Sequence, residues 1–342
     1  MKDVGMGNRY HVMIGDPDAF YRTAGYKAPH DVTLTLRQLD FEEIKVFCRW
    51  KAKAISLPVM LLQLIKVGLS LRKNDMVLIQ YPSYPFLFIA MLFFLRCDNR
   101  IVLIHDFHSL RLKGKLSLLE KLNMKFFNKF IVHTEEMKTY LSRLYPNKDY
   151  YVLGYFGYIL DEPHQDDGQC TTTNEVCFAG NIDKSIFIEQ LVKNNGLGCK
   201  FHLYGICKKA LSKSASNVIY EGVFHPDEVG KLKGSWGLVW DGDSISTCDG
   251  FLGEYLKIIA PHKFSLYIAV GLPVIVWSGS AMTTVVREKE IGIVVDSLFE
   301  LKDKIEAVSS EEYHQIVSNV MRISHEIRKN IMLSNIVKNF FD

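Results

Sequence analysis

Three features are scarce in this sequence of 342 residues: net charge, paired cysteines and long apolar runs. The 41 Lys and Arg residues nearly balance the 38 Asp and Glu residues, so the formal net charge is only +3. A charge this small excludes a whole-protein field that would attract nucleic acid. The seven cysteines include no CxxC pair and no His/Cys cluster, which argues against a disulfide scaffold or a structural zinc site and favours reduced thiols.

The longest apolar run covers residues 86–95, and these ten residues are half of what a membrane-spanning helix needs. Residues 1–9 are polar and contain no apolar core, so we expect no secretory signal. Together these features predict a cytoplasmic protein. Attachment to the inner face of the cell membrane is the alternative.

What the sequence does contain is alternation between short apolar runs and helical patterns. With 48% hydrophobic and 23% charged residues, the length predicts two globular domains. In the first half we expect strands at 10–14, 44–48, 76–80, 101–104, 130–133 and 151–153, separated by helices at 28–39, 58–71, 86–96 and 135–144. In the second half we expect strands at 176–178, 201–204, 218–220, 238–240, 273–277 and 291–295, with helices at 186–193, 261–270 and 281–288.

This alternation predicts two doubly wound α/β domains with parallel sheets, which bind ligands at the carboxyl ends of their strands. We expect an N-terminal domain over 1–156, a polar linker over 157–173, a C-terminal domain over 174–325 and a terminal helix over 326–342. The apolar spacing of residues 311–341 predicts helices at the end of the chain.

The segment around residue 263 carries the strongest chemical signal. Asp241 follows a buried strand, and Pro261, His262 and Lys263 open a helix further along the chain. The free N–H groups and positive dipole at a helix start attract phosphate, and Lys263 adds a full charge there. The pattern predicts a diphosphate site. The alternative is a solvated Lys263 and a capping His262.

The same segment, GLVWDGD through PHKFSLYIAVGLPVIVW, resembles the C-terminal domain of a group of bacterial sugar transferases. That group includes β-1,6-galactofuranosyltransferases and the glucosyltransferase that extends N-acetylglucosamine on serine-rich adhesins. Weaker similarity extends through TAGYKAPHDV, LIHDF and VCFAGN. The resemblance implies the GT-B fold, in which two facing Rossmann-like domains flank a deep cleft. It also implies an acceptor site in the N-terminal domain, a UDP-sugar site in the C-terminal domain and a last helix that crosses back to the N-terminal domain. A dimer arm is the alternative for that helix, and its interrupted heptads disfavour it.

The resemblance further implies which residues bind the donor. They are Thr23, Lys184, Phe224, His225, Pro226, Asp227, Asp241, Pro261, His262, Lys263, Phe264, Ser265 and Leu266. Lys184 stands where the family has an Arg near the diphosphate, and Phe224 where it has an aromatic residue near the uracil. Thr23 as a helix cap and Phe224 as a packing residue are the alternatives. Glu254 and Tyr255, in the loop before Pro261, are expected to lie near the sugar of the donor.

On the acceptor side, His105 and Asp106 follow the predicted strand 101–104. A sugar hydroxyl that attacks an anomeric carbon needs a base, and we expect Asp106 in this role, with His105 as the rival. The alternative is that Asp106 only caps the next turn. His108 and Arg111 are further candidates for holding acceptor or phosphate.

The triplet from Asp241 to Asp243 is a DxD pattern that could bind a metal ion in a GT-A enzyme. No cofactor and no metal are expected in a GT-B fold, because the helix start and Lys263 replace the charge of a metal ion. Many retaining GT-B enzymes have two Glu residues eight apart, but here His262 stands eight residues after Glu254. This departure is compatible with inversion at the anomeric carbon, which the resemblance implies. The resulting prediction is a hexosyltransferase that moves galactofuranose or glucose to a surface polysaccharide or glycoprotein glycan. A UDP-sugar epimerase-like enzyme and an inactive partner subunit are the alternatives.

The run 86–95 predicts either a core helix or a membrane-facing patch beside a lipid-linked acceptor. Five lysines that follow would suit an anionic bilayer: Lys113, Lys115, Lys121, Lys125 and Lys129. The sequence does not determine whether the chain forms a homo-oligomer. No nucleic-acid partner is expected.

Overall fold

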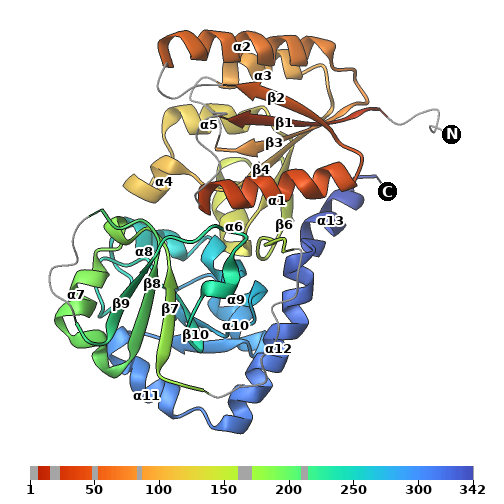
Figure 1. Ribbon diagram of the computed structural model, residues 1–342. Coiled ribbons are helices and arrows are strands. Elements are labelled where there is room, and N and C mark those ends of the chain that lie inside the picture. The colour runs from red at the N-terminus through yellow and green to blue at the C-terminus, as the bar shows by residue number, and fades with distance from the viewer. Residues whose placement is uncertain are drawn as a thin grey trace. The chain divides into compact units, whose positions relative to one another are not determined.

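The computed structural model describes residues 7–15, 24–47, 53–82, 87–160, 172–208 and 215–341. The chain forms two compact units: it leaves the first after Gly154 and returns to it at Leu333. In each unit a parallel sheet is covered by helices (Figure 1).

The sheet of the first unit has six strands in the order β2-β1-β3-β4-β5-β6, and all of its ladders are parallel. The strands are β1 (Arg9–Gly15), β2 (Glu42–Phe47), β3 (Met76–Tyr81), β4 (Asn99–Ile104), β5 (Lys129–Val132) and β6 (Asp149–Val152). Every residue of β3 is buried, as expected for a central strand with helices on both faces.

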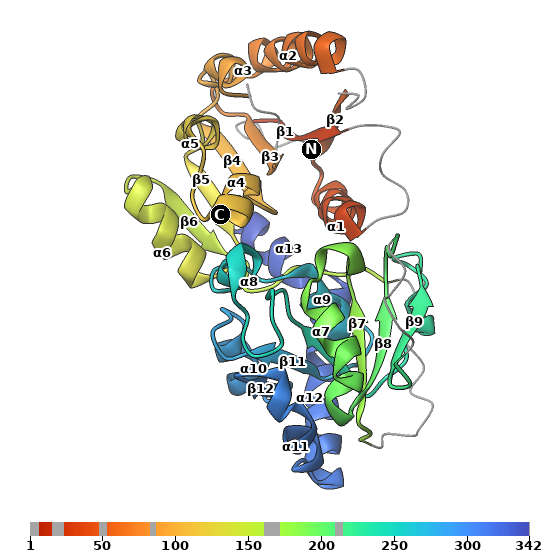
Figure 2. The same cartoon turned by 90° about the vertical axis from the view of Figure 1, so that its left-hand side faces the viewer.

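Two layers of helices cover this sheet. They comprise α1 (Ala24–Gln38), α2 (Lys53–Ser70), α3 (Leu87–Phe94), α4 (His108–Lys113), α5 (Leu118–Lys125), α6 (Glu135–Leu144) and α13 (Ile331–Lys338). Figure 2 shows α2 and α3 lying together on one side, with α1 on the opposite side of the strands. The chain end after α13 packs on the first unit, where the Arg9 guanidinium lies 3.6 Å from the centroid of the Phe341 ring.

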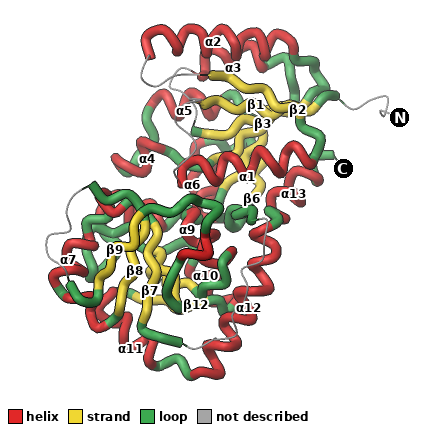
Figure 3. The backbone as a smooth tube through the Cα atoms, in the orientation of Figure 1, coloured by secondary structure: helices red, strands yellow, loops and turns green. Residues whose placement is uncertain are grey.

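The sheet of the second unit has the order β12-β11-β10-β7-β8-β9 and is also parallel. Its strands are drawn in yellow in Figure 3. Its strands are β7 (Glu175–Ala179), β8 (Lys200–Tyr204), β9 (Val218–Gly222), β10 (Trp236–Val239), β11 (Val274–Trp277) and β12 (Gly292–Val295). Its helices are α7 (Phe187–Lys193), α8 (Gly250–Leu256), α9 (His262–Ala269), α10 (Thr283–Lys289), α11 (Leu301–Glu306) and α12 (Ser310–Arg328).

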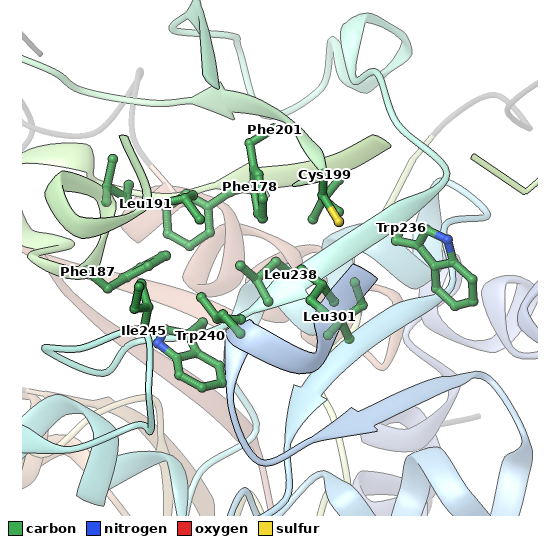
Figure 4. Close-up of a cluster of buried hydrophobic side chains, with 14 of the residues drawn as sticks. Phe178, Phe187, Leu191, Cys199, Phe201, Trp236, Leu238, Trp240, Ile245 and Leu301 are labelled. Atoms are coloured by element: carbon green, nitrogen blue, oxygen red, sulfur yellow. The ribbon is translucent and has the colours of Figure 1, made fainter. Parts of the chain in front are cut away.

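Two apolar cores lie on the two faces of this second sheet. On one face, Phe178, Phe187 and Trp240 pack with Leu301 of α11 (Figure 4). On the other face, Phe264 and residues of α12 fill the space under α9. The sheet is therefore buried on both sides, and ligands are left with its edges and strand ends.

The predicted doubly wound α/β class is confirmed, but three local expectations are wrong. Residues 157–160 are not linker, because Tyr158 is buried in the core beneath α9. The expected polar loop before residue 261 contains a helix, α8, which the sequence pattern did not indicate. The helices α4 and α5 were also missed.

The strand orders point to where ligands bind. In doubly wound sheets, the ligand crevice lies where consecutive strands turn in opposite directions along the sheet. In the first unit this switch falls between β1 and β3, and in the second between β7 and β10. The residues that follow these strands are therefore the first candidates for function.

Candidate active-site residues

In the second unit, the carboxyl ends of β7 and β8 approach so closely that only glycine fits. Gly205 follows β8 with φ +130°, and a Cβ added there would lie 1.7 Å from the carbonyl oxygen of Gly180. Gly180 follows β7, and its amide donates to the carbonyl oxygen of Tyr204 at 2.9 Å. This tight crossing leaves backbone rather than side chains at the end of β7, which is one of the two strands that flank the switch point.

Lys263 reaches the same place from the first turn of α9. Its ammonium lies 2.6 Å from Asp241 Oδ1 and donates to the carbonyl oxygen of Trp240 at 3.0 Å. It also lies 4.7 Å from the centroid of the Phe178 ring. The Lys263 side chain is only 12% exposed, so the charge is held at the end of β10 and not free in solvent. The structure thus brings Asp241 and Lys263 together, as the sequence pattern predicts.

Tyr267 fixes the position of α9 against the sheet. Its ring lies under Gly237, where an added Cβ would be 2.2 Å from the ring. Its hydroxyl accepts a hydrogen bond of 2.8 Å from the amide of Ala179, the last residue of β7. Burial raises the pKa of the Tyr267 phenol, which therefore stays neutral. One side chain consequently holds the helix against both strands of the switch point.

At the start of α9, Pro261 occupies the capping position and His262 the first helical position. The His262 ring lies 5.0 Å from the Tyr158 ring and 6.2 Å from the Phe156 ring, measured between centroids. The Tyr158 hydroxyl donates to the carbonyl oxygen of Pro226 at 2.7 Å. The loop after β9 and the start of α9 are therefore linked through one tyrosine.

The side chains of Phe264, Ser265 and Leu266 point into the protein. Phe264 and Leu266 belong to the core beneath α9, and Ser265 is 1% exposed. Within the stretch 261–266, these three residues can therefore meet a ligand only through their main chain.

Phe224, in the loop after β9, lines a cavity of about 370 Å³. Its ring meets the Tyr204 ring edge to face, with centroids 5.8 Å apart. The cavity is lined by Tyr204, Glu221, Val223, Phe224, Gly230, Lys231 and Lys233. Its volume falls within the usual range for small-molecule sites, so Phe224 combines packing with access to a ligand-sized space.

His225 and Asp227 lie on the surface of the same loop. The Asp227 amide donates to His225 Nδ1 at 3.4 Å, and the Asp227 carboxylate lies 3.5 Å from the same nitrogen. This pair stabilises a turn. Pro226 contributes its carbonyl oxygen to Tyr158, so these three residues shape the loop that carries Phe224.

Lys184, Glu254 and Tyr255, which were expected near the donor, lie in other elements than Lys263. Lys184 is exposed in a single 3-10 turn (Ile182–Lys184), which Asn181 caps. Glu254 and Tyr255 lie in α8, so their placement in a loop is wrong; Tyr255 is 4% exposed, and Glu254 pairs with Lys257 at 2.7 Å. Thr23 lies outside the described residues. Across the ranges that the structure describes, no cluster of three or more His, Cys, Asp or Glu side chains could hold a metal ion, and the metal-free expectation stays a prediction.

In the first unit, a chain of hydrogen bonds connects three strands. Gln80, in β3, lies 2.8 Å from His11 Nε2 through its amide nitrogen and 2.6 Å from His105 Nε2 through its amide oxygen. Burial lowers the pKa of His11 to about 4, so this ring is neutral and accepts from Gln80. His105 must then donate its Nε2 proton to Gln80, which fixes the tautomer of His105.

Asp106 follows His105 and forms an ion pair with α4. Its Oδ2 lies 2.6 Å from Arg111 Nη1, and the Asp106 side chain is 22% exposed. Oδ1 is buried and accepts no hydrogen bond from any residue in the described part of the chain. A carboxylate oxygen requires hydrogen-bond donors, so Oδ1 is a candidate acceptor for a bound hydroxyl group. His108 is exposed on α4, and Arg111 is engaged by Asp106.

Gln80 and His11, which hold His105 in place, are not among the residues predicted from the sequence. A signal was available, because His11 and Gln80 are polar residues within the apolar runs YHVMI and VLIQY. A buried polar residue in a central strand needs a partner, and here the two satisfy each other across β1 and β3.

The chain is similar to known proteins over most of its length. Residues 12–154 match the family model of glucosyltransferase 3-like N-terminal domains, and residues 176–340 match that of the C-terminal domains. The β-1,6-galactofuranosyltransferase WbbI of Escherichia coli is 29% identical over 281 residues, which is 80% of this chain and 81% of WbbI.

Two solved structures share the fold. The sucrose-phosphate synthase of Thermosynechococcus elongatus superimposes with a TM-score of 0.66 at 11% identity, covering 97% of this chain and 98% of that one. Anabaena HepE, solved in complex with UDP, has a TM-score of 0.60 at 10% identity and covers 97% and 99%.

Proposed function

Because this chain belongs to the glucosyltransferase 3-like family of GT-B hexosyltransferases, we propose that it transfers glucose or galactofuranose from UDP to a sugar hydroxyl. The acceptor in this proposal is a surface polysaccharide or glycoprotein glycan. The transfer proceeds with inversion and without a metal ion. One observation carries the proposal: the Lys263 ammonium is held at the switch point of the second sheet.

The donor site we propose uses the start of α9 for the diphosphate. The first amides of a helix and its positive dipole end stabilise phosphate oxygens, and the Lys263 ammonium adds a full charge. The negative charge that develops on departing UDP would meet both groups. The presence of UDP in the HepE structure supports a uridine nucleotide as the leaving group of the donor sugar.

We assign the uracil to the cavity beside Phe224. An aromatic face suits a planar base, and the Tyr204 ring braces Phe224 from its edge. The hydrogen bond from Tyr158 to Pro226 ties this loop to the residues around His262, which supports one continuous donor site in the second unit.

On the acceptor side, Asp106 serves as the base. Its Oδ1, to which no described residue donates a hydrogen bond, accepts the proton of the attacking hydroxyl once the acceptor reaches it, while Arg111 remains paired with Oδ2. The hydroxyl oxygen forms a bond to the anomeric carbon as the bond from that carbon to the phosphate oxygen breaks. The electron pair leaves with UDP. A single displacement of this kind inverts the anomeric centre.

Thermal shift with uridine and guanosine nucleotide sugars, with and without EDTA, tests the donor site. We expect UDP and one UDP-sugar to stabilise the protein regardless of EDTA. Lys263→Met should weaken UDP binding by about tenfold or more, because it removes a charge-assisted contact. Lys257→Met, an exposed lysine of the same unit, is the matched control. A full response in Lys263→Met would refute the assigned diphosphate site.

Asp106→Asn tests the base. We expect turnover to fall by about 100-fold or more while the UDP-induced thermal shift stays unchanged. Normal turnover in this variant would transfer the role to His105, and the absence of any turnover in the unaltered protein would favour the epimerase-like or partner-subunit alternatives.

A further inference from the structure

Three helices of the first unit present apolar side chains to solvent. In α2, Val59, Leu62 and Leu69 are 46–59% exposed, and with Lys66 they follow one another at spacings of three and four residues. This spacing places all four on one helical stripe. The opposite stripe of α2, which includes Met60 and Leu64, is fully buried. The outer face of α2 is thus apolar although it does not pack against the core.

The neighbouring helices continue this surface. In α3, Leu87, Ala90, Met91 and Phe94 are buried, whereas Ile89, Leu92 and the following Leu95 are 39–54% exposed. The run 86–95 is therefore a core helix on one side only, where the structure describes it. In α5, Leu118 is 71% exposed and shares its stripe with Lys121 and Lys125. α3 contacts both α2 and α5, so these three neighbouring helices form one layer, and each of them carries exposed apolar side chains.

We name this layer the outer helical surface. It comprises Val59, Leu62, Lys66, Leu69, Ile89, Leu92, Leu95, Arg96, Leu118, Lys121 and Lys125.

The charge around this surface is strongly one-sided. Residues 51–131 contain 13 Lys and Arg against 4 Asp and Glu, a net charge of 13 − 4 = +9. The remainder of the chain contains 28 against 34, a net charge of −6. The sequences of α2 and α3 hold no carboxylate, and that of α5 holds only Glu120. Glu120 is buried and caps its own helix through Ser117, so it adds no exposed negative charge.

We propose that the outer helical surface docks on an anionic lipid bilayer. Leucine and isoleucine side chains among lysines enter the headgroup region, while the ammonium groups remain at the level of the lipid phosphates. A second copy of this chain fits less well, because a symmetric contact would bring like charges together. No described helix combines the length and hydropathy needed to cross the bilayer, so the attachment is peripheral. This inference stands independently of the proposed sugar chemistry.

Vesicle flotation with the full chain tests the inference. The probes are phosphatidylcholine vesicles with and without about one third phosphatidylglycerol, at low salt and at about 0.5 M NaCl. We expect flotation with the anionic vesicles only, and a large loss of it at high salt. Lys121→Gln/Lys125→Gln should weaken binding by about fivefold for each charge removed. Leu62→Ser/Leu92→Ser should weaken it further, because it removes the inserted apolar side chains.

Lys193→Gln/Lys304→Gln is the matched control, since it removes two exposed lysines of the second unit with the same change in net charge. It should float like the unaltered protein. If flotation fell equally in this control, overall charge alone would explain the effect and the proposal would be overturned. An absence of flotation at low salt would also overturn it, as would a dimer in light scattering that Leu62→Ser/Leu92→Ser converts to a monomer. UDP-induced thermal shift of each variant reports separately on the donor site.

Discussion

Acid should destabilise the first unit well before its carboxylates titrate, because two buried histidines there are held neutral. His133 directly follows β5 and is 2% exposed. Its Nε2 donates a hydrogen bond of 2.8 Å to the carbonyl oxygen of Ile104. Burial lowers the pKa of His133 from 6.5 to about 4, and burial lowers that of His11 to about 4 as well. At a pH between about 4 and 6.5, these two histidines bind more protons in the unfolded chain than in the folded one. Stability is therefore complete above pH 6.5 and is lost as the pH falls toward 4.

The magnitude follows from the shift. From pH 7 to pH 5, each histidine should cost about 2 kcal/mol of unfolding free energy, so the pair costs about 4 kcal/mol. This is a large share of the stability of a typical domain, roughly 5–15 kcal/mol. His133→Gln keeps an N–H donor for Ile104 but cannot titrate. We expect its acid-induced loss to be about 2 kcal/mol, half that of the unaltered protein.

Hydrogen exchange read by mass spectrometry provides the assay, because peptides from β4 and β5 report on this unit alone. Opening free energies at about pH 7 and pH 5, corrected for intrinsic exchange rates, give the loss directly. His225→Gln, at an exposed position of the second unit, should leave the loss in β4 and β5 unchanged. If His133→Gln loses as much stability as the unaltered protein, a protonated His133 is tolerated in the folded state and the reasoning fails.

Three further predictions concern the second unit. Gly205→Ala should destabilise it by about 3 kcal/mol or more in thermal melts, because the new Cβ meets Gly180 and φ +130° is strained for alanine; an unchanged melting temperature would contradict the close crossing. Ser309→Ala removes the cap of α12 and should cost about 1 kcal/mol in denaturant unfolding, whereas a neutral effect would mean that the capping bond carries no weight. Asp241→Asn should tighten UDP binding by about fivefold in calorimetry, since it removes a negative charge beside Lys263; weaker binding would instead make Asp241 the anchor of that ammonium.

Hydrophobic periodicity alone determined the doubly wound class. Apolar runs such as VLIQY and WGLVW must be buried on both faces, and only parallel sheets between helix layers offer that. The pairing of Asp241 with Lys263 was also predictable, because a residue after a buried strand and one at a helix start share the carboxyl edge of such a sheet. The motif at residues 261–263 was therefore enough to predict this edge of the sheet from the sequence.

Tertiary structure alone decided which side chains face that edge. Helical position within the stretch 261–266 does not tell that Phe264 turns into the core while Lys263 turns toward Asp241, because that depends on how α9 is rotated against β10. The tie between His11 and His105 through Gln80 depends on the strand order β1-β3-β4, which brings together residues up to 94 positions apart in sequence (105 − 11 = 94). The outer helical surface has the same origin, since Leu62 and Leu92 read as core residues until packing leaves them uncovered. Sequence sets what must be buried on average, and only packing selects which face of each helix is left to solvent.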